Sequence, residues 1–327
     1  MTAIINLLCE YRTNPLGIDV VEPRFSWRML SELPGAHQVA YRVLAASSPQ
    51  GLTDGAVDLW DSGRVESSQS IHIVYAGEAL GSRQRVHWQV TVWDETGEAI
   101  TSEPAWFELG LLLSDDWQAQ WIGPSLVGGA HSNVPAPFLR KPFSLPGAVQ
   151  SARLYITALG LYECSINGQV VGEDVFAPGW TDYAQRIQYQ VYDVTDLLAD
   201  GENVIGAVLG DGWAVGHVGM GERQNYARQP QLLAQLEITL TDGNTIVVLS
   251  DGSWTHQYGP LLENDMLMGE AYDARLELTG WDRPDFDDDG WLEAQRFNHL
   301  QTKLVATNGP TVRRIEELSP IGEPKMT

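Results

Sequence analysis

The chain has 327 residues, of which 43% are hydrophobic. It is long enough to bury a sizeable core and longer than one core usually grows, so two domains are expected. Its 43 Asp and Glu residues against 20 Lys and Arg give a formal net charge of −23, which repels phosphates and anionic lipids; we therefore expect no nucleic acid and no membrane as partner. Residues 1–10 show no signal-peptide pattern and no uncharged apolar run reaches about 18 residues, so a cytoplasmic chain is expected.

Residues 1–112 have the pattern of a β-sandwich. Segments 40–45, 71–75 and 86–93 are rich in β-branched and aromatic residues and alternate partly with a period of two, which is typical of strands. Turn-forming clusters such as residues 47–49 separate them. The spacing predicts an immunoglobulin- or fibronectin-like domain.

Residues 113–310 carry a second series of strands. The pair Asn167-Gly168 fits a tight type I′ hairpin, in which both central residues need a positive φ, and Asp242-Gly243 repeats the hairpin signal. Helical periodicity is absent apart from a single turn near residues 194–198. The sequence therefore predicts an all-β protein. Further strands are expected at 151–171, in two runs, and at 203–209, 232–240 and 245–249.

No catalytic or metal centre stands out from the residues alone. A pair of carboxylates can act as general acid and base, but among 43 acids a pair such as Glu263 with Asp265 arises by chance, and solvated loop charge is the simpler interpretation. Cys9 and Cys164 are expected in different domains as buried or free thiols. The seven His residues show no zinc-ligand spacing.

Two further segments have a functional and a structural interpretation. Residues 285–290 imitate the start of a calcium loop, but Arg296 stands where a bidentate Glu is needed, so an acidic turn is expected. Residues 210–221 are the most glycine-dense part of the chain. This loop would hold a sugar or a hard cation if it is functional, and would be a corner with Trp213 in the core if it is structural, which is the interpretation we favour.

Several motifs, in the same order along nearly the whole chain, resemble the N-terminal region of bacterial α-L-rhamnosidases of glycoside hydrolase family 78. In the first part these are residues 14–19, 23–28, 59–65, 92–94, 106–108 and 117–123; in the second they are 178–183, 192–195, 210–213, 233–236 and 250–254. The resemblance implies an immunoglobulin/fibronectin-like β-sandwich at 1–112, then a jelly-roll (galactose-binding-like) β-sandwich at 113–310. Residues 311–327 resemble the lead into a downstream domain that is missing here.

The same resemblance implies a non-catalytic role for this region. The family's inverting chemistry uses acidic residues of an (α/α)₆ barrel, which nothing here matches, so no catalytic residue is assigned and the barrel is the expected partner. No cofactor is expected to be required. In some relatives the second domain binds rhamnose through calcium, and the matching positions for both metal and carbohydrate are Asp182, Asn225 and the Pro230 carbonyl. Tyr183 stands where a second polar ligand is expected.

The resemblance leaves three roles open. The chain is either an accessory region of an α-L-rhamnosidase that contacts a rhamnose-containing glycan or glycoside, a free-standing lectin-like carbohydrate-binding protein, or a structural assembly module. Sugar binding by the isolated chain would favour the second role. Exposed apolar patches that match a partner, without sugar binding, would favour the third.

Overall fold

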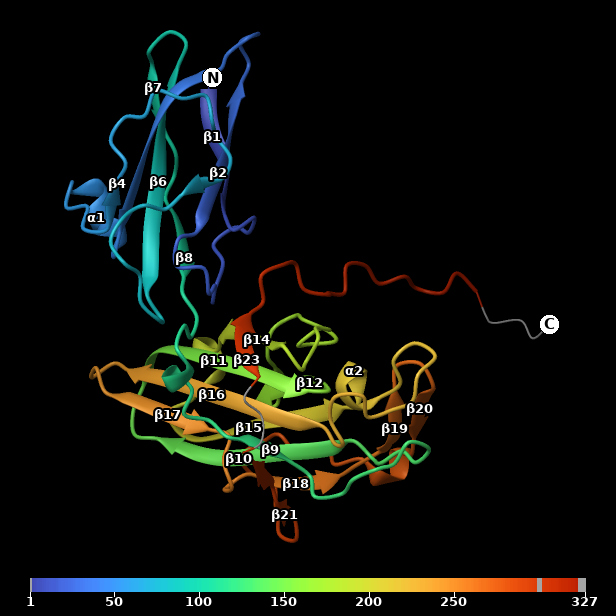
Figure 1. Ribbon diagram of the computed structural model, residues 1–327. Helices are drawn as coiled ribbons and strands as arrows, with labels where there is room; N and C mark the ends of the chain where they lie inside the picture. Colours follow the sequence, from blue (N-terminus) through green and yellow to red (C-terminus); the bar gives the residue numbers. More distant parts are fainter. Residues whose placement is uncertain (1, 299–301, 323–327) are drawn as a thin grey trace. The chain divides into compact units, whose positions relative to one another are not determined.

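A computed structural model describes residues 2–298 and 302–322, and the regular secondary structure of this range is almost all β (Figure 1). The helical elements there are short: α1 (Pro49–Thr53), α2 (Gly212–Val215), and 3₁₀ turns at Ser114–Asp116, Thr195–Leu197 and Ala274–Leu276. The all-β prediction is confirmed, including the single turn expected near residues 194–198. In the part of the chain so described, no helix is long and apolar enough to cross a membrane.

The chain forms two compact units. The first runs to Gln118 and includes Gln188–Val191 and Leu304–Pro310; the second comprises Ala119–Ile187, Tyr192–Lys303 and the residues from Thr311 onward.

The first unit is an immunoglobulin-like sandwich of antiparallel strands. One sheet has the order β1-β2-β5, and the other has the order β4-β3-β6-β7, with β8 also paired to β6. The strands are β1 (Thr2–Cys9), β2 (Arg24–Ser31), β3 (Gln38–Ala46), β4 (Trp60–Asp61), β5 (Ile73–Val74), β6 (Arg85–Asp94), β7 (Ala99–Thr101) and β8 (Ala105–Glu108).

Strict alternation along β6 explains why this segment forms a strand of a sandwich. Every second residue from Val86 to Val92 is buried, so one face of the strand joins the core. Phe25 of β2 stacks on Trp88 of β6, with ring centroids 4.3 Å apart, and thereby joins the two sheets.

The strands from β9 to β23 form a jelly-roll-type sandwich, most of which is the second unit. One sheet, called the β15 sheet, has the order β13-β12-β15-β10-β18-β21; the other, the β16 sheet, has the order β22-β9-β16-β11-β14-β23, with β17 paired to β16. The strands of the β15 sheet are β10 (Pro137–Leu145), β12 (Leu161–Ile166), β13 (Gln169–Val170), β15 (Gly201–Gly210), β18 (Thr255–Tyr258) and β21 (Leu292–Glu293). Those of the β16 sheet are β9 (Trp121–Gly123), β11 (Val149–Leu159), β14 (Arg186–Asp193), β16 (Gln231–Leu240), β17 (Thr245–Leu249), β22 (Gln295–Phe297) and β23 (Lys303–Ala306), and a separate hairpin is made by β19 (Leu261–Asp265) and β20 (Gly269–Tyr272).

Apolar side chains of both sheets meet in one core. Ile205, Ala207 and Leu209 of β15 point inward, while the intervening residues of this strand form the outer face of the β15 sheet. From the opposite sheet, alternate residues of β16 between Leu232 and Leu240 fill the same core. This alternation decides which side chains of β12 and β15 are left facing solvent.

The two predicted hairpins form, with different turns. Asn167 and Gly168 have φ of 53° and 81°, the positive values that a type I′ turn requires, and they join β12 directly to β13. Between β16 and β17 only Gly243 has a positive φ, 86°. There Asp242 accepts a hydrogen bond from the Asn244 N–H (2.9 Å), so the connection is longer than a two-residue turn.

Both cysteines are free and buried, as expected. Cys9 packs in the core of the first unit and Cys164 in that of the second. Burial raises the pKa of both thiols well above the usual value, because a thiolate would lose its hydration.

Candidate functional site

Asp182 lies in the loop between β13 and β14 and is exposed. Its Oδ1 accepts a hydrogen bond from the Ala184 N–H (3.1 Å), and its carbonyl accepts bonds from the N–H groups of Gln185 (2.9 Å) and Arg186 (3.0 Å). Within residues 2–298 and 302–322 the other carboxylate oxygen, Oδ2, has no hydrogen-bond partner. The turn therefore holds one carboxylate oxygen available at the surface.

Asn225 lies in the segment between α2 and β16 and is also exposed. Its amide nitrogen donates to the carbonyl of Glu222 (2.8 Å), which leaves the amide oxygen without a partner in the described part of the chain. A hollow of about 350 Å³ lies next to this residue, and Gln224, Tyr226 and Arg228 line it.

Tyr183 and Tyr226, the residues that follow Asp182 and Asn225, bring the two loops together. Their rings meet edge to face, with centroids 5.1 Å apart. Tyr183 is only 3% exposed and its hydroxyl donates to the carbonyl of Gly179 (2.8 Å), so it fixes the loop from inside. Burial raises the pKa of this phenol, because a phenolate would lose its hydration.

The third predicted residue, Pro230, is buried beside β9. A Cβ on Gly123 would lie 2.6 Å from the Pro230 carbonyl oxygen, so only glycine permits this close approach. Within residues 2–298 and 302–322 no hydrogen bond or close contact joins this oxygen to Asp182 or Asn225, and its role as a ligand stays a prediction.

The donor set can be compared with what calcium prefers, which is about six to eight oxygens. Asp182 and Asn225 offer side-chain oxygens without partners, and a calcium ion would take the rest from main-chain carbonyls, ligand hydroxyls and water. No cluster of three or more His, Cys, Asp or Glu side chains suited to a metal ion occurs among residues 2–298 and 302–322. The binding of calcium at these loops therefore stays a prediction.

A buried charge network supports the Asn225 segment, and no pattern in the sequence indicated it. Arg223, 5% exposed, pairs with Asp211 and donates to the carbonyl of Ser132 (2.7 Å). Asp265, 4% exposed, accepts from the His217 N–H (2.8 Å), and its Oδ2 lies 2.9 Å from the His217 ring. These contacts tie the glycine-dense loop to neighbouring segments.

Asp265 is thus a structural carboxylate. Burial acts to raise its pKa, but the hydrogen bonds from His217, Leu267 and Met268 outweigh burial and lower the pKa of Asp265 to about 2. Glu263 is exposed on the same strand. One carboxylate is buried and the other is exposed, and no catalytic role is assigned to either.

The glycine-dense segment contains the short helix α2, so it is not irregular throughout. The expectation that Trp213 belongs to the core is wrong, because this side chain is only half-buried. Its ring lies parallel to that of exposed Trp180, at an angle of 3° and with centroids 6.4 Å apart. Trp180, on a neighbouring loop, covers part of the Trp213 indole, so this side chain is partly buried without lying between the two sheets.

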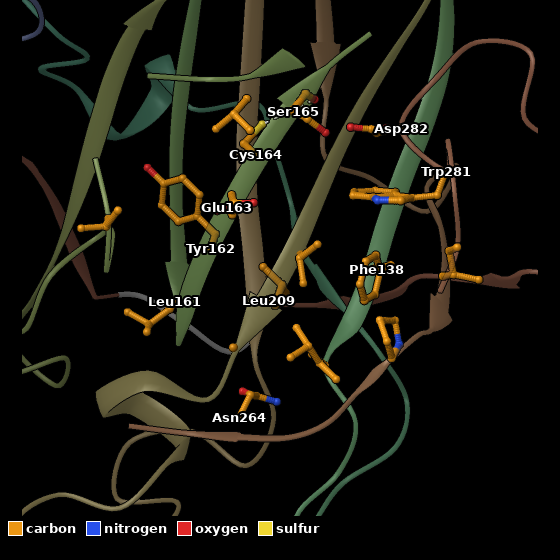
Figure 2. Close-up of a pocket in the computed structure, with 18 of the residues that line it drawn as sticks. Phe138, Leu161, Tyr162, Glu163, Cys164, Ser165, Leu209, Asn264, Trp281 and Asp282 are labelled. Atoms are coloured by element: carbon orange, nitrogen blue, oxygen red, sulfur yellow. Dashed lines mark hydrogen bonds between the residues drawn. The ribbon is translucent and has the colours of Figure 1, made fainter. Parts of the chain in front are cut away.

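A cleft of about 1030 Å³ lies on the outer face of the β15 sheet in the second unit. Figure 2 shows its labelled residues, with Glu163 and Ser165 on β12, Phe138 on β10, and Trp281 and Asp282 from the segment that follows the β19–β20 hairpin. The sequence did not indicate this cleft, because its residues come from distant strands.

These features define an all-β, two-sandwich chain with polar loops and a cleft on its second unit. The chain matches two family models: the N-terminal immunoglobulin domain of Rha78A-like proteins over residues 4–113, and the α-L-rhamnosidase N-terminal domain over residues 147–316. An α-L-rhamnosidase of Formosa agariphila is 41% identical over 310 residues, which cover 92% of this chain and 33% of that protein.

Solved structures show the same architecture. The α-L-rhamnosidase of Streptomyces avermitilis, complexed with L-rhamnose, has a TM-score of 0.91 at 29% identity and covers 97% of this chain, which spans 47% of that structure. The α-L-rhamnosidase from Dictyoglumus thermophilum has a TM-score of 0.90 at 36% identity, with 98% of this chain and 37% of that one covered. The chain belongs to the N-terminal region of the α-L-rhamnosidases of glycoside hydrolase family 78.

Proposed function

We propose that the chain is the non-catalytic accessory region of an α-L-rhamnosidase that acts on terminal α-L-rhamnosides, in concert with a catalytic barrel in the rest of the parent protein. One observation carries this proposal: both matched domains are N-terminal domains of that family, and the chain spans about a third of the length of its curated relatives.

The test is an activity assay on the purified 327-residue chain with 4-nitrophenyl α-L-rhamnopyranoside. We expect no turnover above a heat-denatured control, because the acids of the family's reaction are expected in the barrel and not in this region. Turnover that a single acidic substitution abolishes would overturn the proposal.

A second candidate function is calcium-dependent binding of L-rhamnose by the second unit. It is supported by the unpartnered oxygens of Asp182 and Asn225, by the Tyr183–Tyr226 contact that joins their loops, and by the adjacent hollow. Pro230 would add its carbonyl. Since the protein oxygens alone are too few, the sugar hydroxyls would complete the calcium shell, and affinity should require metal and sugar together.

Calorimetry with L-rhamnose and calcium tests this function. We expect binding heat that a chelator removes, and that Asp182→Ala removes while the melting temperature without metal is unchanged. Asp200→Ala, at another exposed acid, is the matched control and should bind normally. Absence of heat at millimolar sugar would assign the second unit a structural role instead.

A lectin-like role without a parent enzyme and a purely structural assembly role are the alternatives. The lectin-like role would be favoured if the chain binds sugar but the complete enzyme turns over no faster with the chain than without it. Loss of enzyme stability on removal of the chain, without sugar binding, would favour the second.

A further inference from the structure

The outer face of the β15 sheet carries a cleft that the proposed function does not use. Its floor includes Val208 and Gly210 of β15. The outward position before them, Gly206, lies beneath Trp281. Because both glycines lack a side chain, the sheet surface is low here, and polar and aromatic side chains of the neighbouring strands β12 and β10 stand beside it.

Trp281 forms the aromatic wall of the cleft. Its ring lies directly over Gly206: a Cβ there would be 2.5 Å from the indole Cζ3. Phe138 meets the ring edge to face, with centroids 5.1 Å apart. The ring is only half-buried and, in the described part of the chain, its N–H makes no hydrogen bond. An indole held rigidly with an open surface is a platform for an apolar ligand face.

Carboxylates without partners flank this wall. Glu163 of β12 and Asp282, next to Trp281, make no hydrogen bond or ion pair within residues 2–298 and 302–322, and the same holds for Glu270. Figure 2 shows Glu163 across the cleft from Trp281 and Asp282. These groups only accept hydrogen bonds, so they suit a ligand that is rich in donors.

Ser165 provides an independent indication of a ligand. It lines the cleft and pairs with Gly206 in the β12–β15 ladder, it is 6% exposed, and its hydroxyl has no hydrogen-bond partner among the residues that the structure describes. A buried hydroxyl without a partner costs free energy, commonly about 1–3 kcal/mol, unless something bound supplies one. Asn264, at the other end, accepts from the Asp211 N–H through Oδ1 (2.6 Å) and keeps its NH₂ group for a ligand.

We infer that this cleft binds a neutral oligosaccharide, with the C–H face of one sugar ring on Trp281 and its hydroxyls donating to Glu163 and Asp282. The volume lies at the upper end of the range for small-molecule sites, about 300–1,000 Å³, so it holds more than one ring. Uronates and sulfated sugars are disfavoured, because five carboxylates (Glu163, Asp174, Glu270, Glu277 and Asp282) line the cleft against one cationic side chain, Arg314. A bare metal ion is a poorer occupant, because these acids do not gather into a metal-binding cluster in the described residues.

The cleft is separate in its residues from the proposed calcium site. It shares none of Asp182, Asn225 and Pro230, and its chemistry needs no cation. Binding in the cleft should therefore survive a chelator and the substitution Asp182→Ala, so the outcomes for the two sites are distinguishable.

The experiment uses the whole chain on a glycan array that carries neutral oligosaccharides of hexoses, pentoses and 6-deoxyhexoses together with uronate-containing counterparts of the same length. The best neutral oligosaccharide then goes into calorimetry, in EDTA, with Glu163→Gln, Asp282→Asn and Trp281→Phe. Glu202→Gln, an exposed acid on β15 outside the cleft, is the matched control.

We expect a neutral oligosaccharide to bind, and Glu163→Gln or Asp282→Asn to weaken it about three- to tenfold, since each turns a hydrogen bond to a charged acceptor into a weaker bond to a neutral amide oxygen. Glu202→Gln and Asp182→Ala should bind like the unaltered chain. Absence of binding across the neutral array, equal binding of the uronate counterparts, or full affinity in both carboxylate variants would each overturn the inference. Thermal melting of every variant establishes that it is folded.

Discussion

Arg140 Nη1 lies 2.5 Å from Asp288 Oδ2, and this ion pair fastens the acidic run of residues 285–290 to the β15 sheet. The guanidinium is 1% exposed; it also donates to the Arg283 carbonyl (3.1 Å) and lies over the rings of Phe286 and Trp291. The run that imitates a calcium loop is thus an anchoring turn, as its missing twelfth-position Glu indicated.

Arg140→Ala should destabilise the second unit by about 3–5 kcal/mol, because it leaves a partly buried carboxylate and a carbonyl without their donor. Urea unfolding measures this. Arg275→Ala, which breaks the exposed pair with Asp273, is the control and should cost at most about 1 kcal/mol. Equal costs for the two variants would contradict the role of Arg140.

The stability contributed by Asp265 should depend on acid pH. Its pKa of about 2 in the folded chain lies below the usual value of about 3.9, so the stabilisation is complete above about pH 4 and is lost as the pH falls through about 2. Unfolding of the unaltered chain and of Asp265→Asn should therefore differ by about 2 kcal/mol at neutral pH and converge near pH 2. A difference that stays constant across this range, or an equal effect in Asp200→Asn, would contradict the assignment.

In the first unit, the side chain of Gln38 bonds one buried donor and two partly buried carbonyls. Its Oε1 accepts from the Trp27 indole N–H (2.9 Å), and its Nε2 donates to the carbonyls of Ser67 (3.0 Å) and Gln69 (2.8 Å). Gln38→Leu should cost about 1–3 kcal/mol in denaturant unfolding, mainly because the buried Trp27 N–H loses its acceptor. Gln38→Glu, which keeps the acceptor for Trp27, separates the loss of that bond from the loss of the two donors.

Gly206→Ala should displace Trp281, because the added Cβ would overlap the indole. We expect a loss of about 1–3 kcal/mol and weaker oligosaccharide binding. Gly147→Ala is the control, since no atom lies within 4 Å of its added Cβ, and it should be neutral or slightly stabilising. Unchanged binding by a folded Gly206→Ala variant would contradict the role of the indole.

Local chemistry explains what the sequence predicted. The Asn167-Gly168 turn depends on two adjacent residues that tolerate positive φ, and the buried face of β6 depends on alternation within the strand itself. No local pattern specifies contacts between residues that are far apart in the chain. The ion pair of Arg140 with Asp288 and the contact of the Trp281 ring with Gly206 are of this kind. The prediction for Trp213 was wrong for the same reason: Trp180, the residue that partly covers it, comes from another loop.

The burial of Cys9 and Cys164 has a practical use. With both thiols enclosed and protonated at neutral pH, maleimide reagents should leave the native fold untouched. A cysteine introduced at an exposed position such as Glu202 would then accept a fluorophore or spin label selectively, without removal of the natural cysteines. Each buried thiol would react only when its own sandwich opens, so its rate of modification would report that opening.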